Sequence, residues 1–421
     1  MDQAELVAGF ARGARAIALT GPLTARPPPE RCSLQTCKAL APTAFCSGCK
    51  VSAYCNSLCQ TADWKAKHKK ECKSLKARLE NARAEIMCSY SSKGDDEGVD
   101  LMIQAGGDIN GSVQSGSNAG FFPLSAASKE GHVGVIRLLL SKGADPNKTG
   151  QQGLSSLHVA ADGNKAAAAR ILLDAGADKE ALSSNGTTVL AHACSKGSLD
   201  VVKLLVEAAV DVNRPRGYDG NVPLSIAAID GHQNVIQELL RAPGIQVNLC
   251  GHANTLYHKD FPPSLLDLPG IVGELRPLFG YPPLAAAAES MNVAGVLLLL
   301  KAGADVNQVF VLSEVNDDGE HDRGTPLHAA VLSGCPATVK ALIDAGADVN
   351  WKKPDGSSVL FHAKAMAETP AATAMLRGMT ASFNALTGAQ NLPFNSRKKQ
   401  DYPAVKRILE EHNAVCSFPE L

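Results

Sequence analysis

The stretch from Gly324 to Asn350 reads GTPLHAAVLSGCPATVKALIDAGADVN and predicts two short helices joined by a tight turn. Thr325 can cap the first helix, and Pro326 suits its first position, where the missing N–H is not needed. Gly334 and Gly346 can end the two helices, because glycine readily adopts the left-handed conformation found after a helix C-terminus. The apolar face of the second helix comes from Val339, Leu342 and Ile343.

Helix pairs of this kind recur along most of the chain. A leucine anchors the first helix of each pair, and these leucines are Leu124, Leu157, Leu190, Leu224, Leu284, Leu327 and Leu360. Their successive spacings are 33, 33, 34, 60, 43 and 33 residues. The period of 33, with x-P-L-x-x-A-A before an apolar helix and G-A-D-x-N after it, resembles that of ankyrin repeats. The resemblance implies an all-α ankyrin-repeat solenoid of about eight helix pairs, some of them degenerate, over residues 85–421.

The array is expected to begin with a divergent unit and to carry three insertions. The divergent unit fits Ala84 to Asn110, and a connecting basic helix at residues 73–84 should continue into its first helix. The insertions lie near residues 251–280, 308–323 and 366–399. The first is largely apolar, the second is acidic, and the third separates the two helices of the last unit. Loops of this length are either functional or disordered, and the sequence leaves both readings open.

Seven of the twelve cysteines lie between Cys32 and Cys72, after an N-terminal tail of residues 1–31. With one histidine they form four close pairs, namely Cys32 and Cys37, Cys46 and Cys49, Cys55 and Cys59, and His68 and Cys72. A tetrahedral zinc site takes four ligands, so these eight residues can complete two sites. The segment has few large apolar residues, so metal binding must supply its folding free energy. The sequence therefore predicts a small two-zinc module at residues 32–72.

The run CSGCKVSAYCNSLCQTADWKAKHKKEC resembles a MYND finger. In that family the ligand pairs interleave. The resemblance thus implies one zinc site built from Cys32, Cys37, Cys55 and Cys59, and another built from Cys46, Cys49, His68 and Cys72. The first pair departs from the family pattern, since four residues lie between its cysteines where the family usually has two.

MYND fingers commonly dock extended, proline-containing peptides. The resemblance implies Gln60 and Trp64 as the peptide-binding residues of this chain. An exposed tryptophan beside a glutamine would offer an apolar face together with an amide donor and acceptor. Alternatively, Trp64 only packs over the zinc fold, and the sequence does not decide between these roles.

The sequence favours a protein without catalytic activity. Eight ligands for two metals leave no open coordination position, which catalytic zinc requires. The chain has no phosphate-binding G-x-x-x-x-G-K-[ST], no G-x-S-x-G and no H-E-x-x-H. Some lysine methyltransferases contain MYND fingers, but the repeats leave no room for their cofactor-binding domain. A ubiquitin ligase is disfavoured by the order of the cysteines and histidine.

Residues 65–83 are strongly basic and offer an alternative function, a nuclear regulator that contacts nucleic acid through this helix. The run contains no Phe, Tyr or Trp, and nearby lysines also offset the negative charge of zinc-bound thiolates. A solvated helix face is therefore the preferred interpretation.

The overall composition fits a protein that binds other proteins. The net charge is −1, which gives no general attraction to nucleic acid or to an anionic membrane. No apolar run approaches the roughly 20 residues of a membrane span, and no secretory signal is apparent. We expect a monomeric cytoplasmic or nuclear adaptor. Its finger would bind a peptide, and its repeats would bind a second protein through the hairpin tips, Gln151, Gln152, Ser184, Asn185, Tyr218, Asp219, Pro354 and Asp355.

Overall fold

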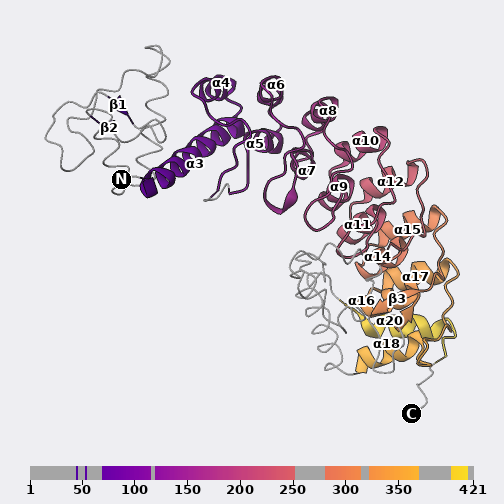
Figure 1. Cartoon of the computed structure of the whole chain (residues 1–421). Coiled ribbons are helices and arrows are strands. Elements are labelled where there is room, and N and C mark those ends of the chain that lie inside the picture. The colour runs from indigo at the N-terminus through magenta and orange to yellow at the C-terminus, as the bar shows by residue number, and fades with distance from the viewer. Residues whose placement is uncertain are drawn as a thin grey trace, which may run out of the picture. The chain divides into compact units, whose positions relative to one another are not determined.

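The computed structural model describes residues 44–45, 53–54, 69–114, 119–251, 280–313, 322–368 and 400–415. The chain divides into two compact units. The first comprises Met1–Gln151, Ser155–Ala160 and Ala167–Ala177, and the second comprises Gln152–Leu154, Ala161–Ala166 and Asp178–Leu421. Almost all regular structure in the described residues is helical (Figure 1).

The first unit contains two short strands and the first helix pairs. Strands β1 (Ala44–Phe45) and β2 (Ala53–Tyr54) pair in antiparallel fashion. Helices α3 (Lys69–Lys93) and α4 (Asp96–Gln104) form one pair, and α5 (Pro123–Glu130) and α6 (Val133–Ser141) form the next. Helix α3 packs against α5, and α4 against α6. The short helix η2 (Gln151–Gly153) precedes the pair α7 (Ser156–Asp162) and α8 (Ala166–Asp174), whose residues are divided between the units.

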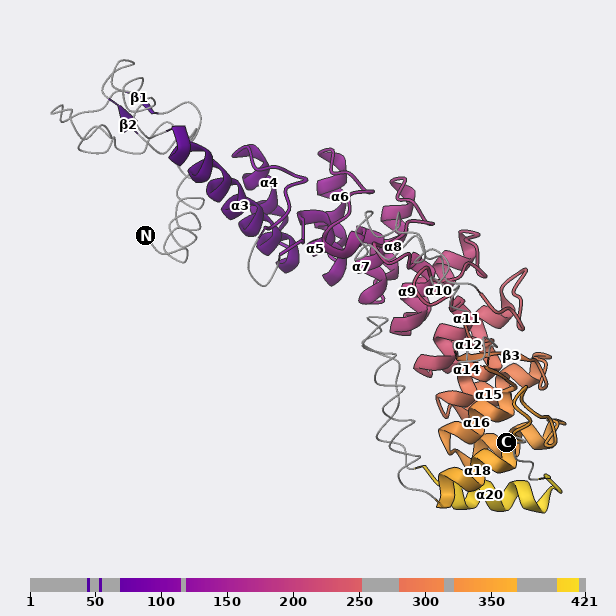
Figure 2. The same cartoon turned by 60° about the horizontal axis from the view of Figure 1, so that its bottom comes forward.

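The second unit contains five further helix pairs. They are α9 (Val189–Lys196) with α10 (Leu199–Glu207), α11 (Pro223–Asp230) with α12 (Gln233–Arg241), α14 (Pro283–Glu289) with α15 (Val293–Lys301), α16 (Pro326–Ser333) with α17 (Pro336–Asp344), and α18 (Val359–Glu368) with α20 (Tyr402–Glu411). The first helices pack side by side in one row and the second helices in another (Figure 2). The described residues therefore contain eight helix pairs, as the 33-residue period predicts.

The core consists of apolar side chains between neighbouring pairs. All seven anchoring leucines are buried, with at most 3% of their surface exposed. In the unit quoted first, Thr325 is the N-cap of α16, Pro326 is its first residue and Gly334 follows it with φ 68°. Val339 and Leu342 of α17 are fully buried. The all-α repeat fold is thus confirmed, and each unit is stabilised by burial against its neighbours.

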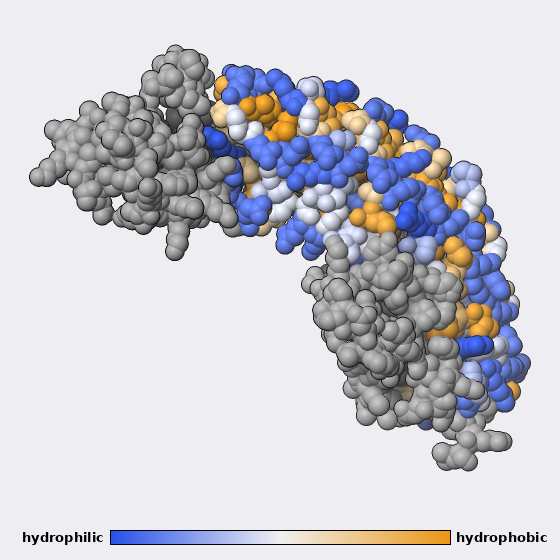
Figure 3. Space-filling view, viewed as in Figure 1, coloured by the Kyte–Doolittle hydropathy of each residue, from blue (hydrophilic) through white to orange (hydrophobic). Residues whose placement is uncertain are grey.

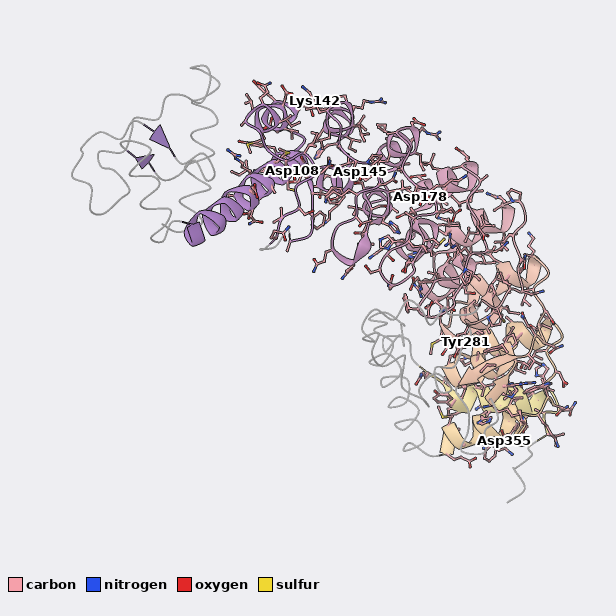
Figure 4. All side chains as sticks on the ribbon, viewed as in Figure 1. Asp108, Lys142, Asp145, Asp178, Tyr281 and Asp355 are labelled. Atoms are coloured by element: carbon pink, nitrogen blue, oxygen red, sulfur yellow. The ribbon has the colours of Figure 1, made fainter. Side chains whose placement is uncertain are left out.

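The Asp-x-Asn that follows most of the second helices forms a hydrogen-bond ladder. Within a turn, the aspartate accepts the backbone N–H two residues on, as Asp108, Asp145 and Asp348 do at 2.8 to 2.9 Å (Asp108 and Asp145 are labelled in Figure 4). Between repeats, Asn307 accepts the Asp348 N–H at 2.8 Å and donates to the Gly346 carbonyl at 3.2 Å. The motif therefore satisfies backbone groups that the ends of the helices leave unpaired.

Three predicted segments can be set beside the described elements. Helix α3 runs without interruption from Lys69 to Lys93, so the basic segment at residues 73–84 continues directly into the first helix of the divergent unit. Helix α18 extends to Glu368, so Met366 is buried in a helix and does not begin the third insertion. The second insertion is partly regular, since strands β3 (Phe310–Ser313) and β4 (Asp322–Gly324) pair in antiparallel fashion. A loop was expected there because the segment is extra length relative to the 33-residue period.

The first insertion leaves and re-enters the repeat array at one point. The Gly280 N–H donates to the Gly251 carbonyl at 2.9 Å, so the two ends of residues 252–279 are held together. Both glycines approach the Gly220 carbonyl so closely that a Cβ atom at either would lie 2.1 to 2.2 Å from its oxygen. Only glycine fits this junction.

We predict that residues 252–279 can be replaced by Asn-Gly with little loss of stability. A two-residue connection turns the Gly251–Gly280 hydrogen bond into that of a β-turn, which Asn-Gly favours. The melting temperature measured by circular dichroism should change by no more than a few degrees, about 1 kcal/mol or less. Gly280→Val in the full chain serves as the opposite control and should destabilise it. Unfolding of the shortened chain would contradict the closed junction.

Candidate protein-interaction surface

Most of the predicted finger lies outside the described residues. This holds for the ligands Cys32, Cys37, Cys46, Cys49, Cys55, Cys59 and His68 and for the peptide-binding residues Gln60 and Trp64. The eighth ligand, Cys72, lies in the first turns of α3. In the sequence, β1 ends directly before Cys46 and β2 directly before Cys55.

Successive hairpin tips of the second unit are joined by backbone hydrogen bonds. The Ser184 N–H donates to the Gln152 carbonyl at 2.8 Å, and the Gly217 N–H donates to the Gly186 carbonyl at 2.9 Å. Of the predicted tip residues, those exposed are Gln151, Gln152, Asn185, Pro354 and Asp355. Because the tips at Gln152, Ser184 and Gly217 are tied together, their exposed groups are already in place before a partner binds.

The third of these tips contains a largely buried ion pair that the sequence did not indicate. The Arg216 guanidinium makes two hydrogen bonds to the Asp219 carboxylate, through Nε to Oδ1 at 3.0 Å and through Nη2 to Oδ2. Only 12% and 13% of the two side chains is exposed. Asp219 also accepts two hydrogen bonds from Asn221, at 3.1 and 2.8 Å. Asp219 is thus fully used within the tip, and its predicted role as a free contact residue is replaced by a structural one.

The same arginine holds Tyr218 in place. Its guanidinium lies 4.5 Å from the centre of the Tyr218 ring, an arrangement that stabilises cation and ring. Burial raises the pKa of Tyr218 to about 12, although the Arg216 charge opposes this shift. Burial alone would lower the pKa of Arg216, but the charge of Asp219 and its hydrogen bonds raise it. The tip therefore presents a fixed, neutral tyrosine, the kind of side chain that dominates many protein interfaces.

We predict that Asp219→Ala destabilises the second unit strongly. The substitution leaves Arg216 buried without its counter-ion, which costs about 3 to 5 kcal/mol. Chemical denaturation followed by circular dichroism should show the loss, whereas Asp344→Ala, at an exposed carboxylate near the end of α17, should change stability by less than about 0.5 kcal/mol. The double variant Arg216→Leu with Asp219→Leu should recover part of the loss. Equal stability of Asp219→Ala and the wild type would contradict the buried pair.

A second cluster of polar side chains joins the end of α7 to α9. The Asp162 carboxylate lies 3.1 Å from Lys196 Nζ and 3.4 Å from His192 Nε2. The hydrogen bond from His192, with that from Lys196, lowers the pKa of Asp162, although burial opposes it. Burial raises the pKa of the neighbouring Asp230, against the hydrogen bond from Ser195 and the charge of Arg216. The charge of Asp162 is therefore offset by neighbouring groups of the same unit.

Four histidines of the repeats make hydrogen bonds within the helical array. His328 Nδ1 lies 3.0 Å from Thr325 Oγ1, and His158 Nδ1 lies 2.9 Å from Ser155 Oγ, so each joins the hydroxyl at the start of its helix. His132 and His232 each reach a carbonyl oxygen of the preceding helix pair at 3.0 Å, those of Ser92 and Ser195. His132 and His232 therefore link neighbouring helix pairs, whereas His158 and His328 act at the start of their own helices.

The described surface is polar and offers no second metal site. In the view of Figure 3 hydrophilic residues cover most of the described surface, with smaller apolar patches between them. The exposed large apolar side chains among the described residues are Leu297, Val309 and Val415. Within the same residues, no three His, Cys, Asp or Glu side chains form a group that could hold a metal. No helix in the described ranges is long and apolar enough to cross a membrane.

Comparisons with known families agree with this architecture. The profile for ankyrin repeats in three copies matches residues 86–183 and 157–249, and that for a single ankyrin repeat matches residues 322–354. The profile of the MYND finger matches residues 32–72. The chain is thus built of ankyrin repeats. Ahead of them it carries a MYND finger, a zinc-binding domain, and both kinds of domain bind proteins and are typically non-catalytic.

One solved structure can be named beside these families. The human ASB11 ankyrin repeat domain is 25% identical to the chain, with coverage of 57% of this chain and 90% of that one and a TM-score of 0.43. No match to a curated protein was found.

Proposed function

We propose that this protein is a non-enzymatic adaptor that holds two protein partners at once. One partner is an extended, proline-containing peptide bound by the MYND finger, and the other is a protein bound along the hairpin tips of the repeats. The hydrogen bonds between successive tips carry this proposal, because they fix the contact surface before binding. Two weak sites on one chain give avidity toward a shared target.

The finger of this adaptor holds zinc at two structural sites. Its donors are seven cysteines and one histidine, and thiolate and imidazole are the ligands that structural zinc sites prefer. We assign Cys32, Cys37, Cys55 and Cys59 to one site, and Cys46, Cys49, His68 and Cys72 to the other. When bound, zinc supplies folding free energy to this segment. Gln60 and Trp64 then present an amide and an apolar ring to the peptide.

The polar character of the described surface supports protein recognition by hydrogen bonds. Exposed Gln152, Asn185 and Asp355 can pair with backbone or side-chain groups of a partner, and Tyr218 can supply the buried contact between them. We assign the protein to the cytoplasm or nucleus as a monomer, which fits free thiols at Cys88 and Cys194.

The test is a comparison of Trp64→Ala with wild type in affinity purification from cells. Loss of the apolar ring should remove a subset of bound proteins by about tenfold or more, while partners of the repeats remain. Zinc content must stay unchanged in the variant, so that loss of binding is not loss of folding. Identical partners at equal yield would exclude the finger as the docking site.

The matched control replaces charge on the neighbouring basic segment. Lys67→Glu, Lys69→Glu and Lys70→Glu together should leave the protein partners of an adaptor in place. If instead the triple variant loses a nucleic acid that wild type retains, the protein acts through residues 65–83 as a nucleic-acid binder.

A further inference from the structure

Helix α3 belongs to two structures at once. It is one uninterrupted helix from Lys69 to Lys93, and Cys72 lies near its start. The end of the same helix is part of the repeat core, where Met87 and Cys88 are buried. Cys72 and Met87 are separated by about 22 Å along the helix axis at 1.5 Å per residue.

The second half of α3 is held firmly by the repeats. Among the described side chains of α3, Ala84 is the first buried one, and it packs with Cys88, Val113 and Ala126. A second cluster joins Ile86 and Met87 to Met102, with Tyr90 and Ile103 beside it. Just before them, Asn81 Oδ1 accepts the Gln114 N–H at 2.6 Å.

The first half of α3 contains good helix formers but is short, and its charges oppose the helix dipole. Residues 69–80 read KKECKSLKARLE, with Lys69 and Lys70 at the end of the helix where its dipole is positive. Lys73 follows Lys70 at i+3, so like charges also repel on one side of the helix. A helical segment of about 12 residues is marginal in water even with a favourable sequence. In Figure 2 this half extends beyond α4 and α5.

We propose that zinc bound through Cys72 stabilises the first ankyrin repeat by way of α3, so that metal occupancy of the finger and folding of the repeat are thermodynamically coupled. Zinc fixes the start of the helix, the repeat core fixes its end, and the continuous backbone transmits the order of one to the other. The coupling is reciprocal, because a repeat that holds α3 also favours zinc binding. This inference rests on the proposed assignment of Cys72 as a zinc ligand.

A consequence is that the first repeat reports the state of the finger. With zinc bound, α3 and α4 are protected. Without it, residues 69–80 unfold and the adjoining turns of α3 open more often. Helices α16 and α17, in the other unit, have no part in the coupling.

The test is hydrogen exchange on the full chain, read by mass spectrometry, before and after zinc removal by a chelator. Amides of residues 81–104 should exchange at least about tenfold faster without zinc, while those of residues 326–344 should be unchanged. Insertion of two glycines after Arg78 interrupts the helix. This variant should still bind zinc, but exchange at residues 81–104 should no longer change when the zinc is removed. If zinc leaves and residues 81–104 keep their protection, the coupling is absent.

The reciprocal test measures zinc affinity with the repeats altered. Met87→Ala removes a buried side chain from the first repeat and should weaken zinc binding by about fivefold or more. Leu342→Ala is the matched control, because Leu342 is as fully buried but lies in α17. Equal zinc affinity of the two variants overturns the coupling.

The zinc-ligand assignment of Cys72 and the coupling through α3 can be tested separately. Cys72→Ser with full zinc content means that the ligand assignment under the proposed function is wrong, and the link between α3 and the metal is lost with it. Loss of one zinc from Cys72→Ser with unchanged exchange at residues 81–104 leaves the assignment standing and refutes the coupling alone.

Discussion

Purified protein should contain about two zinc atoms per chain, and Cys49→Ser should lower this to about one. A closed tetrahedral site depends on all four ligands, and structural zinc contributes about 10 to 16 kcal/mol of folding free energy in isolated fingers. Elemental analysis of the purified variants gives the measurement. Cys335→Ser is the control, because Cys335 lies at the start of α17 and should leave the zinc content unchanged.

Pairs of substitutions test which cysteines share a metal. Cys49→Ser with Cys72→Ser alters a single proposed site and should retain about one zinc. Cys49→Ser with Cys55→Ser alters both sites and should retain none. The opposite result would reverse the interleaved assignment, and a wild-type chain that folds at its N-terminus without zinc would exclude the two-zinc module.

Protonation of His328 should make the repeats less stable as the pH falls from about 6 to 4. The ring is 2% exposed, and burial, with the charges of Lys353 and His362, lowers its pKa from 6.5 to about 3. Between these values the unfolded chain binds a proton that the folded chain does not. The contribution of neutral His328 to the free energy of unfolding is therefore fully present above pH 6.5. It decreases by about 1.4 kcal/mol per pH unit as the pH falls toward 3.

The measurement uses the chain's second tryptophan as a local probe. Trp351 lies 5.0 Å from the His328 ring, centre to centre, so its fluorescence reports this repeat once Trp64 is replaced by phenylalanine. The free energy of unfolding is measured with urea at pH 7, 6, 5 and 4. Its slope against pH should be smaller in His328→Asn than in the parent protein by about 1.4 kcal/mol per pH unit. The difference between the two proteins at pH 7 gives the effect of the lost hydrogen bond to Thr325, without the effect of protonation. Parallel pH dependence of the two would show that His328 does not cause it.

The repeats could be predicted from the sequence because each unit carries its own local signals. A proline at the first helical position, a leucine at the fixed spacing and a glycine after the helix together indicate one helix, as Pro326, Leu327 and Gly334 do for α16. Agreement among several such signals identified eight helix pairs even where single units diverge.

The interaction surface could be predicted only in part, because burial depends on neighbouring repeats. Arg216 and Asp219 stand in a turn-forming stretch, RPRGYDGN, where charged residues are usually exposed. The two residues lie three apart in one tip, and the adjoining Gly217 N–H donates to the Gly186 carbonyl of the preceding tip. Strands β3 and β4 lie in a segment that was expected to be a loop because it is extra length relative to the repeat period. The spacing of repeats shows where extra residues are inserted but not whether they pair as strands.

The Asp-x-Asn ladder also bears on how such an adaptor can change its partners over time. Asn307 recognises only the main chain of the following unit, the Asp348 N–H and the Gly346 carbonyl, and no particular side chain. A unit can thus be duplicated, lost or given new residues at its tip without a compensating substitution next door. Substitutions at the tips can therefore change which partner is bound, while the hydrogen bonds between units stay the same.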